Sequence, residues 1–75
     1  MRTVHIIVER HSDGYLGYPL GIRGAVVGQG ETLEAAVADT ASAVRFHLET
    51  FGEGMWDPEA TPLAVFVDEV RLPEP

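Results

Sequence analysis

The sequence contains no cysteine and no lysine, and both absences limit what the chain can do. Without cysteine there is no disulfide and no thiolate metal ligand, so the 75 residues must build one small core from apolar side chains alone. The longest apolar runs, such as "VHIIV", are far too short to cross a bilayer. The first residues lack the long apolar region and the small-residue cleavage site of a signal peptide. These absences predict a single soluble domain, residues 1–75, in the cytoplasm.

Positive charge is scarce, and this scarcity bears on the choice of partner. Twelve acidic residues stand against five arginines, which gives a net charge of −7, and the arginines are scattered along the chain. Nucleic-acid binding usually needs clustered cations that neutralise phosphates. We therefore expect no direct binding of nucleic acid or membrane. A basic protein would suit this acidic chain, although acidity also simply keeps a small protein soluble.

The pattern of apolar residues predicts a mixed α+β fold. Short runs rich in β-branched and aromatic residues indicate strands at 3–10, 15–20, 24–29 and 63–72. Between the last two, residues 32–51 place apolar side chains on one helical stripe. The order is β-β-β-α-β. It predicts a four-stranded mixed sheet with one helix on one face, the last strand running parallel beside the first. Residues 51–62, which include two prolines, are expected to form a loop.

Two glycines precede the helix in "GQGETLEAAV", residues 28–37, and raise the question of a phosphate-binding loop. Glu31 and Glu34 flank the helix start and would repel phosphate, and no lysine is present to assist. Thr32 is instead well placed as the N-cap residue, with Glu34 complementing the helix dipole. The stretch therefore predicts a helix start and no cofactor site.

These motifs also resemble a known family. "DGY", an extended segment that ends in "YP", a glycine turn and "GQGETLEAAV" together resemble the HicB-like antitoxin domain over residues 3–50. The turn "LGIRG" and the residue Ala25 depart from the usual family pattern. The matching residues are Asp13, Gly14, Tyr15, Tyr18, Pro19, Gly24, Gly30, Thr32, Leu33, Glu34 and Ala36.

The resemblance implies a fold and a function. Family members have a partial ribonuclease-H-like β-β-β-α-β domain, and they resemble antitoxins that mask a small basic ribonuclease toxin. Many carry a further C-terminal DNA-binding segment. Since this chain ends soon after its last expected strand, we expect no DNA-binding domain here.

A ribonuclease-H-like topology invites a search for metal-binding carboxylates. Glu9, Asp39 and Asp68 are scattered along the chain, and "Glu9-x-His11-x-Asp13" spans an expected turn with spacing that is unspecific for a metal. No serine–histidine arrangement indicates nucleophilic catalysis. The sequence therefore predicts a protein that is not an enzyme and that holds no catalytic, cofactor or metal site.

The expected fold leaves one sheet face without a helix, and monomers rarely expose large apolar patches. If Val4, Ile6 and Val8 face the helix, then Ile7 and Glu9 face away from it. The first hypothesis is an antitoxin-like domain that binds a small basic toxin through this open face. The second is a self-associating module, most simply a homodimer, and the third is a degenerate metal-dependent nuclease. Aromatic residues dominate binding hot spots. The interface candidates are Tyr15, Tyr18, Phe46, Trp56 and Phe66.

Overall fold

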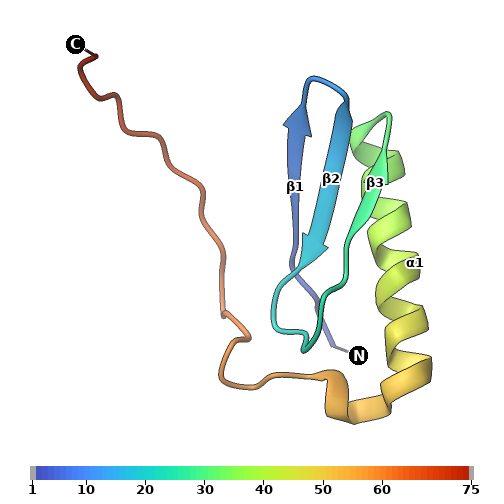
Figure 1. The fold of residues 1–75 in the computed structure, drawn as a ribbon. Helices are drawn as coiled ribbons and strands as arrows, with labels where there is room; N and C mark the ends of the chain where they lie inside the picture. The colour runs from blue at the N-terminus through green and yellow to red at the C-terminus, as the bar shows by residue number, and fades with distance from the viewer. Residues whose placement is uncertain (1, 75) are drawn as a thin grey trace.

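The computed structural model describes residues 2–74 and has one helix packed on one face of a three-stranded antiparallel sheet (Figure 1). The strand order across the sheet is β1-β2-β3. The elements along the chain are β1 (Ile6–His11), β2 (Gly14–Pro19), β3 (Gly28–Gly30), α1 (Leu33–Phe51) and the 3-10 helix η1 (Gly52–Met55).

The first two strands form a hairpin whose register fixes which side chains share a face. Val8 lies opposite Gly17, and Ile7 lies opposite Tyr18. Directly opposite residues of an antiparallel pair point to the same face, and the face alternates along each strand. The hairpin therefore splits its residues into two sets, one facing α1 and one facing away from it. The turn falls between His11 and Gly14, where the sequence "HSDG" predicts it.

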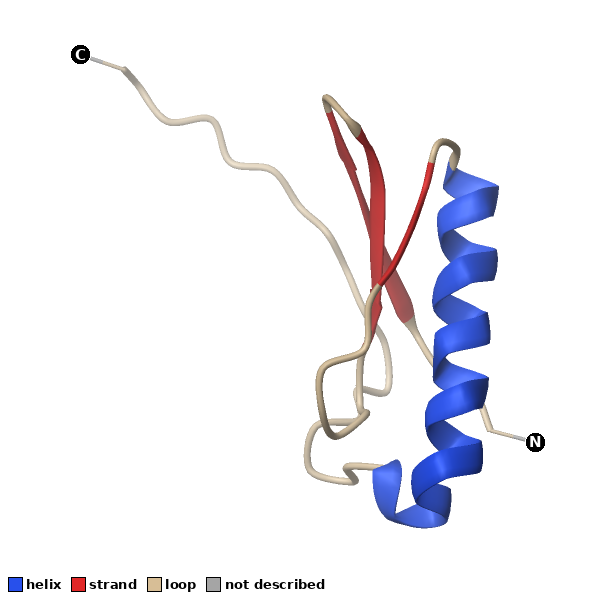
Figure 2. Cartoon of the chain, turned by 45° about the vertical axis from the view of Figure 1, so that its right-hand side comes forward, coloured by secondary structure: helices blue, strands red, loops and turns tan. Residues whose placement is uncertain are grey.

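The sheet meets the helix through positions that have no side chain. Gly17 and Gly28 lie so close to Thr40 that a Cβ on either glycine would overlap the threonine. A Cβ on Gly30 would lie 2.7 Å from the Cβ of Ala35. Since Thr40 is fully buried between these glycines, the centre of the contact is a small side chain against bare backbone. This lets α1 approach β2 and β3 closely (Figure 2).

The helix begins and ends where the sequence predicts. The Thr32 side chain accepts a hydrogen bond of 3.0 Å from the Ala35 N–H, which confirms Thr32 as the N-cap. At the other end Gly52 adopts a φ of 63° and its N–H bonds to the Leu48 carbonyl. Glycine reaches this left-handed region without steric cost, so it ends the helix cleanly.

The expected four-stranded mixed sheet is wrong. The sheet has three strands, all antiparallel, and residues 63–72 form no strand. Residues 63–74, which we call the C-terminal arm, run extended and apart from the sheet (Figure 1). The β-branched pattern predicts a fourth strand at residues 63–72, and this prediction is wrong, because such a pattern does not supply the neighbouring strand with which a segment must pair. The third strand is also shorter than expected, because only Gly28–Gly30 pairs with β2.

The chain between η1 and the arm is fixed to the loop that follows β2. Arg23 donates its backbone N–H to the Met55 carbonyl at 2.7 Å, and Asp57 donates to the Gly21 carbonyl at 2.9 Å. Ile22 and Trp56 form an isolated antiparallel bridge between these two hydrogen bonds. Backbone hydrogen bonds thus attach the start of the arm to the rest of the fold. We call residues 55–61 the root of the arm.

The chain exposes much more surface than a compact monomer of its mass. Its accessible surface is 6196 Å², whereas a compact monomer of 8.1 kDa exposes about 4,500 Å². Its radius of gyration is 14.3 Å, against about 11 Å for a compact chain of this length. Among the described residues, no helix has both the length and the apolar character needed to cross a membrane.

Candidate functional site

The sheet face opposite α1 is not covered by any element of secondary structure (Figure 2). Because Gly17, Gly28 and Gly30 point to the helix, the alternate residues of each strand point away from it. Most of them are only half-buried, although the centre of a sheet would normally be covered. We call this surface the open face, and it consists of Ile7, Glu9, His11, Leu16, Tyr18 and Gln29.

Glu9 provides the negative charge of the open face. One carboxylate oxygen lies 2.8 Å from Nε2 of His11, and the other accepts a hydrogen bond of 3.2 Å from the Tyr18 hydroxyl. The hydrogen bond to His11, followed by that from Tyr18, lowers the pKa of Glu9 below its ordinary value. The carboxylate is therefore held charged and oriented on a face that is otherwise partly apolar.

Tyr18 presents a phenol ring beside that carboxylate. Partial burial, followed by the hydrogen bond to Glu9, raises the pKa of Tyr18 above its ordinary value. The phenol thus stays protonated and donates to Glu9 throughout the neutral range. An oriented aromatic ring next to a fixed charge is well suited to recognising a protein surface, because it offers both apolar area and a polar contact.

A second uncovered surface lies at the start of β1 and beside the residues that precede it. It is a groove of about 510 Å³ between β1 and α1. Arg2, Arg45 and Glu53 form its polar rim. Its apolar lining consists of Val4, Ile6, Ala41, Val44, Leu48, Met55 and Trp56. The apolar stripe of α1 is therefore wider than the three-stranded sheet can cover, and Leu48 remains 38% exposed.

The predicted interface residues do not come together on one surface. Tyr18 lies on the open face, whereas Tyr15 lies opposite Gly30 on the face toward the helix. Phe46 is 70% exposed on α1, and Phe66 is 89% exposed on the arm. Trp56 lies at the root of the arm. Of the five, Tyr18 alone belongs to the open face.

Trp56 lies in a polar setting of its own. The Arg2 guanidinium stacks over its ring, 4.0 Å from the ring centre, and Arg2 also approaches Glu53 at 4.0 Å. Its indole Nε1 is buried and has no hydrogen-bond partner among residues 2–74. The tryptophan thus lines the groove and has one indole donor without a partner in the described part of the chain.

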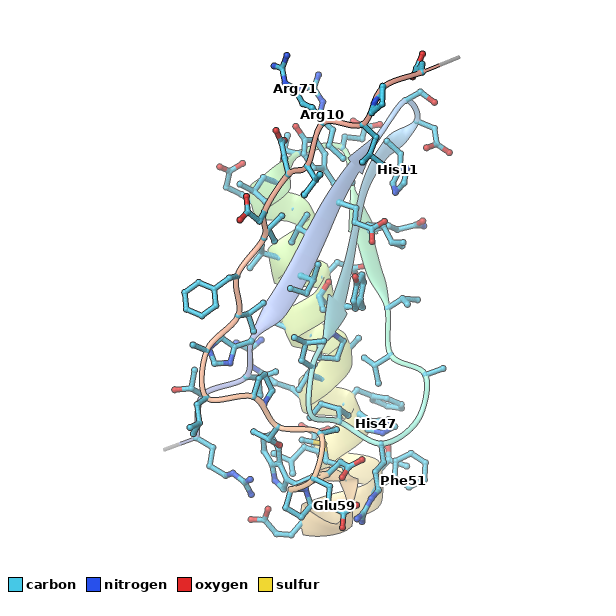
Figure 3. The ribbon with its side chains drawn as sticks, turned by 90° about the vertical axis from the view of Figure 1, so that its left-hand side faces the viewer. Arg10, His11, His47, Phe51, Glu59 and Arg71 are labelled. Carbon is cyan, nitrogen blue, oxygen red and sulfur yellow. The ribbon has the colours of Figure 1, made fainter. Side chains whose placement is uncertain are left out.

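At the end of α1, His47 and Phe51 lie together (Figure 3). Their ring centres are 4.6 Å apart, and His47 Nε2 lies 2.7 Å from the Arg23 carbonyl oxygen. This pair holds the loop after β2 against the helix. His47 therefore packs between the end of α1 and this loop.

Sequence reasoning missed Leu16 as a member of the open face. Leu16 lies opposite Glu9 across the hairpin, so it shares the face of Glu9 and Ile7. The loop residues are Ser12 and Asp13, because Gly14 already pairs with His11, so the register differs by two residues from that of an Asp13-Gly14 loop. Both registers give each β2 residue the same face, so the signal for Leu16 was available.

The acidic residues considered as metal ligands lie on separate elements. Asp39, on α1, accepts a hydrogen bond of 2.9 Å from the Gln29 N–H, and Asp68 lies on the arm. Within residues 2–74, no three histidine or acidic side chains are grouped so that they could hold a metal ion. Glu9 and His11 contact each other, but Asp13 does not join them.

Comparison with protein-family models, with curated proteins and with solved structures finds no match to this chain.

Proposed function

We propose that this chain is a non-enzymatic, antitoxin-like domain that binds a small basic protein, in the way of the HicB-like antitoxin domains that residues 3–50 resemble. The partner would be a small ribonuclease toxin whose active surface is masked by the bound domain. The proposal rests mainly on one observation: an uncovered sheet face that combines apolar area with an oriented carboxylate, in a chain of net charge −7.

The open face has the composition of a binding surface. Ile7, Leu16 and Tyr18 provide apolar and aromatic area on a rigid hairpin, and such residues dominate the energetics of protein interfaces. Glu9 provides a charged acceptor for a lysine or arginine of the partner. Since hydrogen bonds already hold Glu9 in place, little side-chain entropy would be lost on binding.

The excess of acidic residues favours a basic protein as the proposed partner. Charge complementarity raises association rates and suppresses binding to acidic proteins. A small ribonuclease toxin is basic because it must bind RNA, so the acidic domain would compete for that same surface. Masking needs no catalytic group in the masking protein.

The test is co-expression with the product of a short basic reading frame beside this gene, followed by co-purification and a ribonuclease assay. We expect a stable complex in which ribonuclease activity is inhibited stoichiometrically. Leu16→Arg places a large cation at the centre of the open face and should weaken binding at least tenfold. Phe46→Arg makes the same type of change at an exposed helix position and should leave binding nearly intact.

The two variants separate specific from general effects. Equal loss of binding in both variants would show that the open face is not the recognition surface. Failure of the wild-type chain to bind or inhibit the basic protein would overturn the proposed function.

A second candidate function is self-association, and the groove along β1 favours it. That surface lies on a different side of the molecule from the open face, so a homodimer and a toxin-binding domain are compatible.

A further inference from the structure

The C-terminal arm has the sequence of a strand without the pairing of one. Leu63, Val65 and Val67 alternate with Ala64 and Phe66, so both sides of the extended arm are apolar. Leu63 is fully exposed at 102%, and Phe66 is 89% exposed. An apolar segment that is exposed along almost all of its length is unusual, because native proteins normally pair or cover such segments.

The edge of β1 offers the missing pairing. The His5 carbonyl accepts a hydrogen bond of 2.9 Å from the Leu20 N–H, so His5 belongs to a hydrogen-bonded pair with the chain of β2. Such pairs alternate along an antiparallel ladder, so the N–H and C=O groups of Ile6, Val8 and Arg10 point outward. Glu9 and Arg10 are the charged residues of this strand, but it has no proline and no bulge, so its outward backbone groups can pair with another strand.

We propose that two copies of this chain exchange arms, with each arm lying in the groove between β1 and α1 of the other copy. Each copy has one arm and one groove, so a reciprocal exchange fills both grooves and leaves no arm without a binding surface. The result is a closed two-fold dimer and not an open chain of molecules. Backbone hydrogen bonds along β1 fix the arm, and its apolar side chains fill the groove.

Charge favours this match. Arg2 and Arg45 border the groove, and Arg10 lies at the far end of β1. The arm carries Asp68 and Glu69 directly after its apolar stretch. The groove thus has two arginines and one acidic residue, Glu53, at its border. The arm as a whole brings three carboxylates against one arginine, Arg71. Opposite charges at the rim set orientation and partner choice.

The contacts of the root fix the direction in which the arm leaves the fold, which is away from its own β1. Residues 55–57 are bonded to the loop at residues 21–23, and the Thr61 hydroxyl donates to the Asp57 carbonyl at 2.7 Å. Pro62 follows at once and fixes its own φ angle. From this root the arm diverges from its own β1 (Figure 1). Exchange leaves these root contacts in place.

The arm is long enough to pair with the whole of β1, and the chain has enough exposed surface to form a stable interface. An extended arm of residues 63–74 reaches roughly 40 Å, which exceeds the roughly 20 Å length of a six-residue strand such as β1. The accessible surface of 6196 Å² exceeds that of a compact monomer by roughly 1,700 Å². A stable interface removes about 800 Å² from each partner. The excess surface is therefore more than large enough to supply one partner's share of a standard interface.

The first test measures the mass of the full-length chain by light scattering during gel filtration and by sedimentation. We expect twice 8.1 kDa. In the arm, the double substitution V65D/V67D should weaken dimerisation at least tenfold without loss of helix signal in circular dichroism, since the arm lies outside the folded body. Phe46→Asp, an equally polar change outside the groove, should remain dimeric.

The second test distinguishes exchange from closure of the arm on its own chain. Isotope-labelled and unlabelled chains are mixed, and magnetisation transfer is measured between methyl groups of the arm, such as Val65, and of the groove, such as Val4 and Leu48. Transfer across differently labelled chains supports exchange.

Three results would overturn the proposal: a monomer at all concentrations, a dimer whose arm remains free, or transfer confined to one chain. None of them needs a toxin, so failure here is distinct from failure of the proposed function.

Discussion

The two faces of the sheet differ in the side chains that they present. The face toward α1 is defined by side chains that are absent, because Gly17, Gly28 and Gly30 let the helix backbone approach. The open face is defined by side chains that are present, with Glu9 joined to both His11 and Tyr18. The comparison teaches that packing against the helix and the proposed recognition surface lie on opposite faces of this hairpin, so each face can be altered without the other.

The largest effect is expected from filling the glycine-lined face. A Cβ in Gly28→Ala would overlap backbone atoms of Thr40, which cannot move without shifting the helix. We expect a loss of about 2 to 3 kcal/mol in the free energy of unfolding. The measurement is urea denaturation followed by circular dichroism. Gly54→Ala is the matched control, because a Cβ there meets nothing within 4 Å, and it should change stability by less than about 0.5 kcal/mol.

An intermediate effect is expected from the one buried hydroxyl on the same face. Thr40 donates to the Ala36 carbonyl at 2.7 Å, and Thr50 makes the same type of bond to the Phe46 carbonyl at 2.9 Å in an exposed turn. Thr40→Val should cost about 1 kcal/mol, because a buried hydrogen bond is lost and a methyl group is forced against the glycines. Thr50→Val should cost less than half of that in the same urea experiment. Equal costs would mean that burial on this face does not matter.

The smallest effect is expected on the open face, and it depends on pH. Because the pKa of Glu9 is lower in the folded chain than its ordinary 4.5, Glu9 stabilises the fold above that pH. The contribution is lost as the pH falls through the lowered folded value. Glu9→Gln should therefore lower stability slightly at neutral pH and be indistinguishable from wild type in strong acid.

Urea midpoints across the acid range would measure this convergence. Glu49→Gln makes the same change of charge on the exposed surface of α1 and should not converge in the same way. If Glu9→Gln stayed equally below wild type at every pH, its effect would come from packing and not from the charge of Glu9.

Local signals in the sequence were sufficient for the helix and the hairpin. Thr32 and Gly52 mark the helix ends because capping depends on nearest neighbours only. Asp13-Gly14 marks the turn region, although the loop residues are Ser12 and Asp13 and the register is shifted by two residues from that of an Asp13-Gly14 loop. Because side chains alternate between faces along a strand, Val8 and Ile7 lie on opposite faces, so the residues on each face of the hairpin could be predicted.

Features that depend on distant partners could not be predicted. The third strand contains glycine, glutamine and glycine, so no β-branched side chain marks it, and its position follows from contact with Thr40. The arm shows the reverse case. Its pattern is typical of a strand, but pairing needs a neighbour, and residues 55–61 direct it away from the one that was expected. The aromatic candidates were scattered for the same reason, since composition selects residue types and not a common surface.

The chain contains a single tryptophan, and its location makes the molecule its own optical reporter. Trp56 borders the groove, and the Arg2 guanidinium lies against its ring. Whatever settles there alters the polarity around the indole, so intrinsic fluorescence follows occupancy without any dye or tag. Dilution of the unmodified protein would then yield an assembly constant directly from its emission spectrum.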